Sequence, residues 1–386
     1  MTDGVESLRN PRVKPEHRAY RTADGHVRIG SVIHGIGAEV LDEDGWVWSL
    51  VQALDGSRPP RAVVSEVLRT HPTLEGQDVL QAMTDLWEAG FLDDAVPAPP
   101  ELSAREQTRY SRGVPLLRWM DLGPRTSAWQ TQLALRRARV LLVGVGGTGG
   151  FAAQGLVASG VGLLHCVDPD VVELSNLNRQ PLYRERDLGE PKVKAAVEDL
   201  RALNSDVTVT GEQRAVGCPA DLAGLVSPGD HDSPGYDVVL VAADQPADIR
   251  RWANRVCLAA GVPWAVAGYR GPLVTVGVHV PGQGGCWECL RAGEVERRDL
   301  RLGPGQDESV ASPRMPWNPA GAVTAGLSGS LLVHAAIALI TGVPPLEPGF
   351  RYGINLMTPG EPVLERFPRR SGCPACADVP AGRPRP

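Results

Sequence analysis

A glycine-rich turn narrows the folds open to this chain more than any other segment. The apolar run at 140–143 leads into residues 144–150, five of which are glycine, and a helix-compatible stretch follows. A second apolar run ends in Asp168, about 20 residues beyond the glycines. A helix that starts at such a turn presents free N–H groups and a partial positive charge to phosphate. The layout predicts a nucleotide-binding βαβ unit, with phosphate held at Gly144, Gly146, Gly147 and Gly149.

Length and composition predict two globular domains and exclude several functions. The chain has 386 residues, of which 42% are hydrophobic, enough for one large α/β domain and a smaller one. A net charge of −6 and the lack of long basic runs argue against nucleic acid as a partner. The acidic N-terminus lacks the apolar stretch of a secretion signal, which favours the cytoplasm. Glycines, serines and His334 interrupt the apolar span 322–343, so we expect a buried helix and no membrane partner.

Lysine is rare in this chain, and its positions are informative. Among 39 lysine and arginine residues, lysine occurs only at 14, 192 and 194. Two of these three follow the glycine turn, which suggests that a compact ammonium group is needed there and not a guanidinium fork. Chance placement is the alternative.

The first hundred residues predict a small α+β domain. Residues 1–18 are polar and contain two prolines, which predicts a flexible arm. Turn signals between residues 19 and 41 predict an antiparallel ribbon. Apolar residues at helical spacing predict three helices after it, at 45–54, 61–70 and 77–89. This order of elements is typical of a winged-helix-like module.

Two segments of this module resemble the PqqD-like peptide-recognition domains of ribosomal-peptide biosynthesis. They are residues 41–56 and 86–92, and the resemblance covers residues 12–95. It implies that a leader peptide adds a strand to the edge of the sheet and lies against a helix. An ordinary winged helix used for DNA binding or dimerisation is the alternative. The last helix carries three acidic residues and no arginine or lysine, which disfavours DNA.

A proline-rich spacer separates this module from the rest of the chain. Residues 95–100 read Ala-Val-Pro-Ala-Pro-Pro, and polar residues follow. We therefore expect a peptide-recognition domain at 1–95, a linker at 96–108 and an α/β domain at 109–386. A helix at 126–137 is expected to lead into the glycine strand.

Several polar residues beyond the glycines recur together in one known family. They are the acid Asp168, the run 175–180, Lys192, and Asp244 at the end of the expected strand 237–244. With the glycine turn they resemble the ThiF/MoeB adenylating enzymes, relatives of the ubiquitin-activating enzymes, over residues 109–376. The resemblance implies a Rossmann-like α/β fold with a mostly parallel sheet. It also implies activation of a peptide carboxylate by ATP, with release of pyrophosphate.

The resemblance assigns a role to each polar residue. Asp168 would bind the ribose hydroxyls, Asn176 and Gln180 would position the phosphate region, and Arg179 and Lys192 would neutralise the triphosphate. Plainer alternatives remain: Asp168 could cap a turn, Asn176 could satisfy backbone groups, and Arg179 could pair with a neighbouring acid.

Two further residues would complete the site. Asp244 would bind Mg²⁺, which prefers hard oxygen ligands. Arg112 matches the arginine that such enzymes insert into the site of a partner subunit, which implies a homodimer. The family's usual Asp-Asn after the metal-binding strand is replaced by Asp244-Gln245, which puts the local geometry in doubt.

Four of the seven cysteines form two Cys-x-x-Cys pairs, which predict a structural zinc site at Cys286, Cys289, Cys373 and Cys376. Disulfides are the alternative, disfavoured by a reducing compartment. Of the remaining thiols, Cys166 and Cys257 are expected in the core, and Cys218 lies in a loop without an assigned role.

The segment 291–318 corresponds to the family's loop over the active site and contains no cysteine. This absence suggests that the reaction stops at the adenylate, or that an external nucleophile or downstream modifying enzyme consumes it. Three functions remain: adenylation of a leader-bearing peptide, an ATP-inactive leader-binding scaffold for a cyclodehydratase, and activation of a ubiquitin-like sulfur carrier. Because a scaffold has no use for the full set of site residues, the sequence favours the enzyme.

Overall fold

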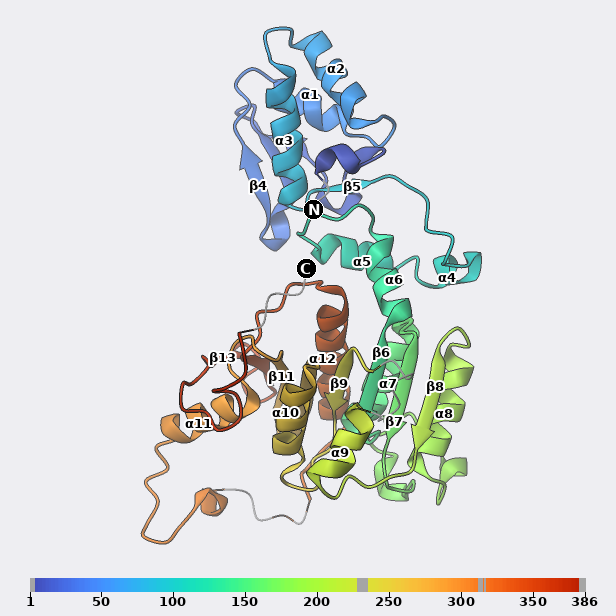
Figure 1. The fold of residues 1–386 in the computed structure, drawn as a ribbon, viewed down its shortest axis with the longest axis vertical. Helices are drawn as coiled ribbons and strands as arrows, with labels where there is room; N and C mark the ends of the chain where they lie inside the picture. The colour runs from blue at the N-terminus through green and yellow to red at the C-terminus, as the bar shows by residue number, and fades with distance from the viewer. Residues whose placement is uncertain (1–3, 228–234, 312–314, 316, 382–386) are drawn as a thin grey trace. The chain divides into compact units, whose positions relative to one another are not determined.

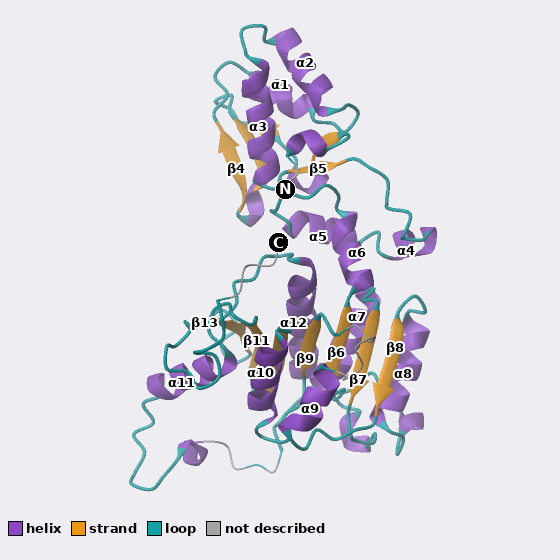
Figure 2. Ribbon diagram, viewed as in Figure 1, coloured by secondary structure: helices purple, strands orange, loops and turns teal. Residues whose placement is uncertain are grey.

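The computed structural model describes residues 4–227, 235–311, 315 and 317–381, which form two compact units. The N-terminal unit comprises residues up to 134 together with 343–345, and the C-terminal unit comprises 135–342 and 346–386. Each unit has its own hydrophobic core. Figure 1 traces the chain through both, and Figure 2 shows their helices and strands.

The N-terminal unit contains the predicted antiparallel ribbon followed by three helices. Its sheet has the order β2-β3-β4. The ribbon consists of β2 (Tyr20–Arg21), β3 (Val27–Ser31) and β4 (Ile36–Val40). The helices are α1 (Trp46–Ala53), α2 (Pro60–Thr70) and α3 (Gly76–Glu88). The α3 side chains Val79, Met83 and Leu86 recur at helical spacing and are buried in the core of the unit, as the periodicity predicts.

The prediction of a flexible arm at the N-terminus is wrong for residues 5–17. Here β1 (Pro11–Val13) pairs with β5 (Leu92–Asp94) in an antiparallel ladder. Lys14 is buried, and its ammonium donates a hydrogen bond of 2.6 Å to the carbonyl oxygen of Asp121. The segment is polar because its charged side chains form buried and partly buried ion pairs with residues that lie far away in the sequence.

The helices after β5 belong to the same unit. They are α4 (Ala104–Arg109), α5 (Gly113–Met120) and α6 (Trp129–Arg137), the last of which crosses the unit boundary. Arg118 on α5 binds Glu16 through a forked pair of hydrogen bonds of 2.6 and 2.7 Å. The helix α4 begins inside the predicted linker, because Ser103 and Glu106 form a capping box at its start. The compact unit thus continues beyond the predicted boundary at residue 95.

The C-terminal unit is built on an eight-stranded sheet, which confirms the predicted Rossmann-like α/β fold. Its strand order is β13-β12-β11-β10-β9-β6-β7-β8. The run from β10 to β8 is parallel, and β11, β12 and β13 are antiparallel. The parallel strands are β6 (Arg139–Val143), β7 (Leu163–Val167), β8 (Thr208–Glu212), β9 (Val238–Val241) and β10 (Trp264–Arg270). The others are β11 (Leu273–His279), β12 (Phe350–Asn355) and β13 (Pro362–Arg366).

Helices pack against this sheet and shield its parallel strands from water. On one face lie α7 (Gly147–Ser159), α8 (Lys192–Leu203) and α12 (Ala322–Thr341), and α7 contacts both of the other helices. The helices α9 (Pro219–Val226) and α10 (Ile249–Ala260) contact each other, and with the strands they enclose a second apolar cluster. Burial of both faces explains why the parallel strands read as continuous apolar runs.

The apolar span 322–343 forms α12, which packs on α7 and on β10. By length and composition α12 could cross a membrane. Its Ser328 hydroxyl, however, lies 2.6 Å from the Thr148 hydroxyl on α7, and the pair is buried. Gly329 allows this close approach, since a Cβ at that position would lie 2.4 Å from the Cβ of Phe151. The packing agrees with the predicted buried helix.

The segment after β11 contains more helix than the sequence predicts. The helix α11 (Trp287–Arg297) occupies the start of the expected loop 291–318. Asn318 closes the loop, because its side chain donates to the Tyr269 carbonyl across 2.6 Å and accepts from Gly271 N–H across 3.3 Å. Residues 312–314 and 316 lie outside the described part of the chain.

Candidate functional site

A cavity of about 620 Å³ opens at the carboxyl ends of the parallel strands. In the sheet, β7 and then β8 lie on one side of β6, whereas β9 and then β10 lie on its other side. The gap between β6 and β9 is therefore a topological switch point, where open α/β sheets bind ligands. The cavity is lined by Gly144 after β6, Asp168 after β7 and Asp244 after β9.

The glycine turn gives the cavity its backbone wall. Gly144 has a φ of 93°, a left-handed conformation that favours glycine, and a Cβ there would lie 2.9 Å from the Ala243 nitrogen. Gly146 and Gly147 also line the cavity, and α7 starts at Gly147. Gly149 does not line it; a Cβ at Gly149 would meet the Gly144 carbonyl oxygen at 1.9 Å. This glycine keeps α7 close to the turn, whereas the other three face the space in which a phosphate would lie.

Asp168 both lines the cavity and fixes the glycine turn. Its carboxylate accepts hydrogen bonds from the backbone N–H of Val145 at 2.8 Å and of Asp170 at 2.9 Å. Burial raises the pKa of Asp168 above its usual range, although nearby Lys192 and these two hydrogen bonds lower it. The turn-capping alternative is thus part of the structure, and a role at the ribose stays a prediction.

Lys192 is placed at the cavity by the start of α8. Its ammonium forms a 2.8 Å ion pair with Asp170, and its side chain is only 7% exposed. Asp170, by contrast, is 60% exposed and also lines the cavity. The other two lysines lie elsewhere: Lys14 is buried in the N-terminal unit, and Lys194 forms an exposed pair with Glu190. Of the three lysines, Lys192 alone lines the cavity.

The run 175–180 forms a compact turn at the cavity rim. The Asn176 side chain accepts a hydrogen bond from Glu173 N–H at 3.1 Å, so it satisfies a backbone group. The Arg179 guanidinium donates to the Ser175 carbonyl at 2.7 Å and pairs with no carboxylate in the described chain. Gln180 is buried, and its side-chain oxygen has no partner among the described residues. All three line the cavity.

Asp244 follows β9 and is exposed to the cavity. The departure noted in the sequence, Gln245-Pro246, forms a cis peptide bond and also lines the cavity. Arg112 is exposed at the start of α5 in the N-terminal unit and is not among the lining residues. Its insertion into a partner subunit's site stays a prediction.

The lining residues that the sequence did not assign include Arg250 on α10, Tyr269 on β10 and Asn318. Burial raises the pKa of the Tyr269 hydroxyl, while Arg179 opposes this by its charge and a hydrogen bond. Arg250 lies in the first turn of α10, shortly after Asp244 in the sequence, and that position could have drawn attention to it. Tyr269 and Asn318 carry no local signal, because only the sheet and the loop closure bring them to the cavity.

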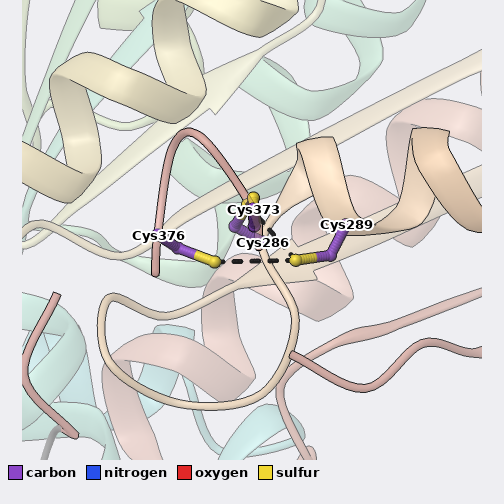
Figure 3. A group of neighbouring side chains, drawn as sticks. All are labelled: Cys286, Cys289, Cys373 and Cys376. Atoms are coloured by element: carbon purple, nitrogen blue, oxygen red, sulfur yellow. Dashed lines mark hydrogen bonds between the residues drawn. The ribbon is translucent and has the colours of Figure 1, made fainter. Parts of the chain in front are cut away.

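Away from the cavity, the four paired cysteines meet as the sequence predicts (Figure 3). Their sulfur atoms all lie within 4.8 Å of one another, and the shortest separation, between Cys289 and Cys376, is 3.5 Å. A disulfide requires about 2.05 Å, whereas four thiolates around one zinc ion at about 2.3 Å lie roughly 3.8 Å apart. The donor set therefore fits a tetrahedral metal and not two disulfides.

A buried amide supports this cluster, and the other thiols lie apart from it. Asn254 on α10 donates to the Cys286 sulfur at 3.5 Å and accepts from Trp287 N–H at 3.1 Å. Cys166 and Cys257 are buried in the core, as predicted, and burial raises the pKa of each thiol to about 12. Cys218 is exposed at the start of α9.

Comparison with known sequences gives a consistent set of relatives. A profile of the ThiF family matches residues 115–375. The Molybdopterin-synthase adenylyltransferase of Escherichia coli (strain K12) is 37% identical over 193 residues, which cover 49% of this chain and 70% of that protein. The Adenylyltransferase and sulfurtransferase MOCS3 of Bos taurus is 35% identical over 289 residues, which cover 74% of this chain but 56% of that protein.

Solved structures of similar fold cover nearly the whole chain. The crystal structure of E. coli MccB superposes with a TM-score of 0.72 at 22% identity, covering 97% of this chain and 99% of that one. The Microcin C7 biosynthetic enzyme MccB in complex with N-formylated MccA gives a TM-score of 0.68 at 23% identity, with 95% and 99% covered. At these identities the likeness shows a common fold.

Proposed function

The chain belongs to the ThiF family, and on that premise we propose that this ATP-dependent adenylyltransferase activates a carboxylate of a peptide in ribosomal-peptide biosynthesis. One observation carries the proposal: the glycine turn, the cations Lys192 and Arg179 and the exposed carboxylate of Asp244 line a single cavity at the switch point of the sheet. The domain matched by the family accounts for the chemistry, and the N-terminal unit accounts for the choice of a peptide.

The reaction needs cations around an anionic centre. One oxygen of the substrate carboxylate forms a bond to the α-phosphorus of ATP, while the bond from that phosphorus to the bridging oxygen breaks and pyrophosphate leaves. Both reactants are negatively charged, so their approach is repulsive without compensation. Lys192 and Arg179 would bind the phosphates, and the N-terminus of α7 adds a partial positive charge.

Two acids would complete the nucleotide site. Asp168 would accept from the ribose hydroxyls while it holds the turn through Val145, and Asn176 and Gln180 would border the phosphates. Asp244 is exposed at the carboxyl end of β9, and an exposed carboxylate facing a phosphate site is the hard oxygen ligand that Mg²⁺ requires. When bound, the ion would neutralise phosphate charge.

The Cys₄ cluster would hold a structural zinc ion. Four thiolates leave no coordination position open for water, so the ion would take no part in the chemistry. Two of the ligands lie at the start of α11 and two in the C-terminal tail, so the ion would tie the tail to the unit.

The N-terminal unit has an edge suited to a peptide. The strand β4 ends the sheet β2-β3-β4, so one side of its backbone has no strand partner in the described chain. Ile33 and Leu41, which flank β4, are 94% and 70% exposed. An extended leader peptide could add a strand there and cover these apolar side chains. The predicted PqqD-like recognition domain supports this assignment, as does the structural likeness to MccB, which has been crystallised with MccA.

A second function is favoured by the sequence relatives. The two sequence relatives described above are named molybdopterin-synthase adenylyltransferase and MOCS3, which points to a sulfur carrier as substrate. The C-terminal unit suits that function equally well, but the N-terminal unit would then have no assigned role. A scaffold without ATP chemistry would not need Lys192, Arg179 and Asp244 in one cavity.

A trapping experiment separates these functions. Synthetic peptides encoded beside the gene, and a sulfur carrier ending in Gly-Gly, would each be mixed with the enzyme, ATP and hydroxylamine. Hydroxylamine converts an acyl-adenylate into a stable hydroxamate that mass spectrometry detects. We expect hydroxamate from a peptide. Hydroxamate from the carrier alone would favour the second function. If the enzyme consumes ATP with neither the peptides nor the carrier, the scaffold is favoured.

A further inference from the structure

Arg250 is a partly buried cation at the cavity, and its Nε is shielded from water without a hydrogen-bond partner in the described chain. It lies in the first turn of α10, lines the cavity, and its buried Nε has no partner among the described residues. Burial lowers the pKa of Arg250 below its usual range, and the charges of Arg291 and Arg351 lower it further. Asp244 and Glu294 oppose the shift from a distance.

Two other partly buried arginines of this chain are fully paired. Arg118 binds both oxygens of Glu16, and Arg351 binds Glu294 at 2.5 Å and also Glu365. A guanidinium withdrawn from water is costly unless an anion pairs with it. Arg250 differs from these two arginines, and a bound anion would remove the difference by pairing with its guanidinium.

Within the described chain, two acids act on Arg250, and both have other partners or roles. Glu294 already pairs with Arg351, Arg298 and Arg291, so its charge is shared among three guanidinium groups. Asp244, the other acid that acts on Arg250, is exposed to the cavity and is the proposed ligand for Mg²⁺. Near Arg250, positive charge exceeds negative charge.

The sheet places Arg250 on the far side of Asp244 from the nucleotide residues. Asp168 follows β7, Lys192 starts α8, and Asp244 follows β9. Arg250 lies beside β10, because a Cβ atom added to Gly268 on that strand would lie 3.5 Å from one of the terminal nitrogens of Arg250. If the ribose lies at Asp168 and the phosphates extend toward Asp244, the region of the cavity near Arg250 would hold the substrate group that attacks the α-phosphorus.

We propose that Arg250 binds the substrate carboxylate and directs one of its oxygens to the α-phosphorus. This inference rests on the proposed adenylation. A guanidinium fork binds a carboxylate in a fixed plane, so it selects an ionised acid over an amide of the same shape. The carboxylate is either the C-terminus of the peptide or an aspartate or glutamate side chain, two sources with the same chemistry.

The test compares Arg250→Gln and Arg250→Lys with a matched control, Arg251→Gln. Arg251 is the next residue on α10, is 52% exposed and pairs with Asp248 on the surface. Affinity for ATP alone is measured by calorimetry. ATP–pyrophosphate exchange is then measured with four pools of synthetic heptapeptides of random sequence: free acids or C-terminal amides, each with or without aspartate and glutamate.

We expect Arg250→Gln to raise the peptide KM about tenfold or more, with ATP affinity unchanged. Arg250→Lys should raise the peptide KM less, because the positive charge remains although the guanidinium fork is lost. This variant also keeps the test valid if Arg250→Gln does not fold. Arg251→Gln should behave like the wild type. Exchange restricted to free acids identifies the C-terminal carboxylate, and exchange restricted to pools with acidic residues identifies a side chain.

Four results would overturn the inference. An unchanged peptide KM in both Arg250 variants removes its role in carboxylate binding. Weaker ATP binding with an unchanged peptide KM makes Arg250 a phosphate ligand instead. Wild-type exchange with the amide pool that lacks aspartate and glutamate excludes a carboxylate substrate. A wild-type enzyme that gives no exchange with any pool, and no hydroxamate from the peptides encoded beside the gene, refutes the proposed peptide adenylation itself, and the role of Arg250 falls with it.

Discussion

The ammonium of Lys192 lies 2.8 Å from the carboxylate of Asp170, in a pair whose lysine is buried and whose aspartate is open to the cavity. Asp170 thereby holds the ammonium at the wall, where a phosphate could replace or join the aspartate as its partner. The pair connects the loop after β7 to the start of α8, and the backbone N–H of Lys192 also donates to the Asp170 carbonyl at 2.9 Å.

We predict that Lys192→Ala weakens ATP binding and lowers pyrophosphate exchange about a hundredfold or more, because a charged phosphate contact is lost. Asp170→Asn should keep most exchange activity, since it removes the lysine's competing partner and leaves the ammonium. Calorimetry with ATP and exchange kinetics check both variants. Equal losses in the two variants would indicate that the pair only stabilises the fold.

Metal removal tests the cysteine cluster. The purified chain should contain about one zinc ion, as four thiolates bind a single tetrahedral metal. Cys376→Ser should lose the metal and lower the melting temperature, whereas Cys218→Ser, an exposed thiol outside the cluster, should retain both. Elemental analysis and thermal unfolding measure these outcomes. Full metal content in Cys376→Ser would contradict the assignment.

Glu294 should make stability depend on acid pH. Burial tends to raise its pKa, but Arg351 and Arg291 lower it below the usual range. A pKa that is lower in the folded state means that the carboxylate stabilises the fold above its unfolded pKa of about 4.3, and that this contribution is lost as the pH falls through the folded pKa.

We therefore expect Glu294→Gln to lower the free energy of unfolding by about 3–5 kcal/mol at neutral pH and by less at acid pH. Glu296→Gln, an exposed residue on the same helix paired with Arg370, is the control and should have little effect. Denaturant unfolding at several pH values measures both. A loss that stays constant with pH would exclude an ionic origin.

The edge of β4 should govern peptide affinity. Leu41→Asp places a charge where an added strand would cover an apolar side chain, so the affinity for the peptide that supports exchange should fall while ATP affinity is retained. Arg69→Ala on the exposed side of α2 is the control. Fluorescence polarisation with the labelled peptide measures the change. Unchanged affinity in Leu41→Asp would place the peptide elsewhere.

The sequence predicted those parts of the fold and the site that depend on local patterns. The glycine turn, the helical periodicity of α3 and the two cysteine pairs each lie within a few residues, and the structure forms all three. Asp244 was predictable because it directly follows an apolar strand, and the carboxyl ends of parallel strands meet at one edge.

Other features depend on contacts between distant segments. Residues 5–17 read as a polar arm because Asp93, Arg118 and Asp121, which pair with this segment or bind its lysine, lie about eighty to one hundred residues away. The same holds for Tyr269 and Asn318, which the sheet and the loop closure bring to the cavity. Arg250 resembles any surface arginine of an amphipathic helix until the cavity beside it is known.

Peptide-dependent exchange of labelled pyrophosphate into ATP tests the central claim most directly, with Asp244→Ala beside the wild type. Exchange requires a reversible adenylate, so neither simple ATP hydrolysis nor ATP binding gives the signal. We predict exchange that depends on a peptide and is abolished by Asp244→Ala, the proposed magnesium ligand. Failure of the wild type to bind ATP, or exchange that is independent of any peptide or carrier, would contradict the account.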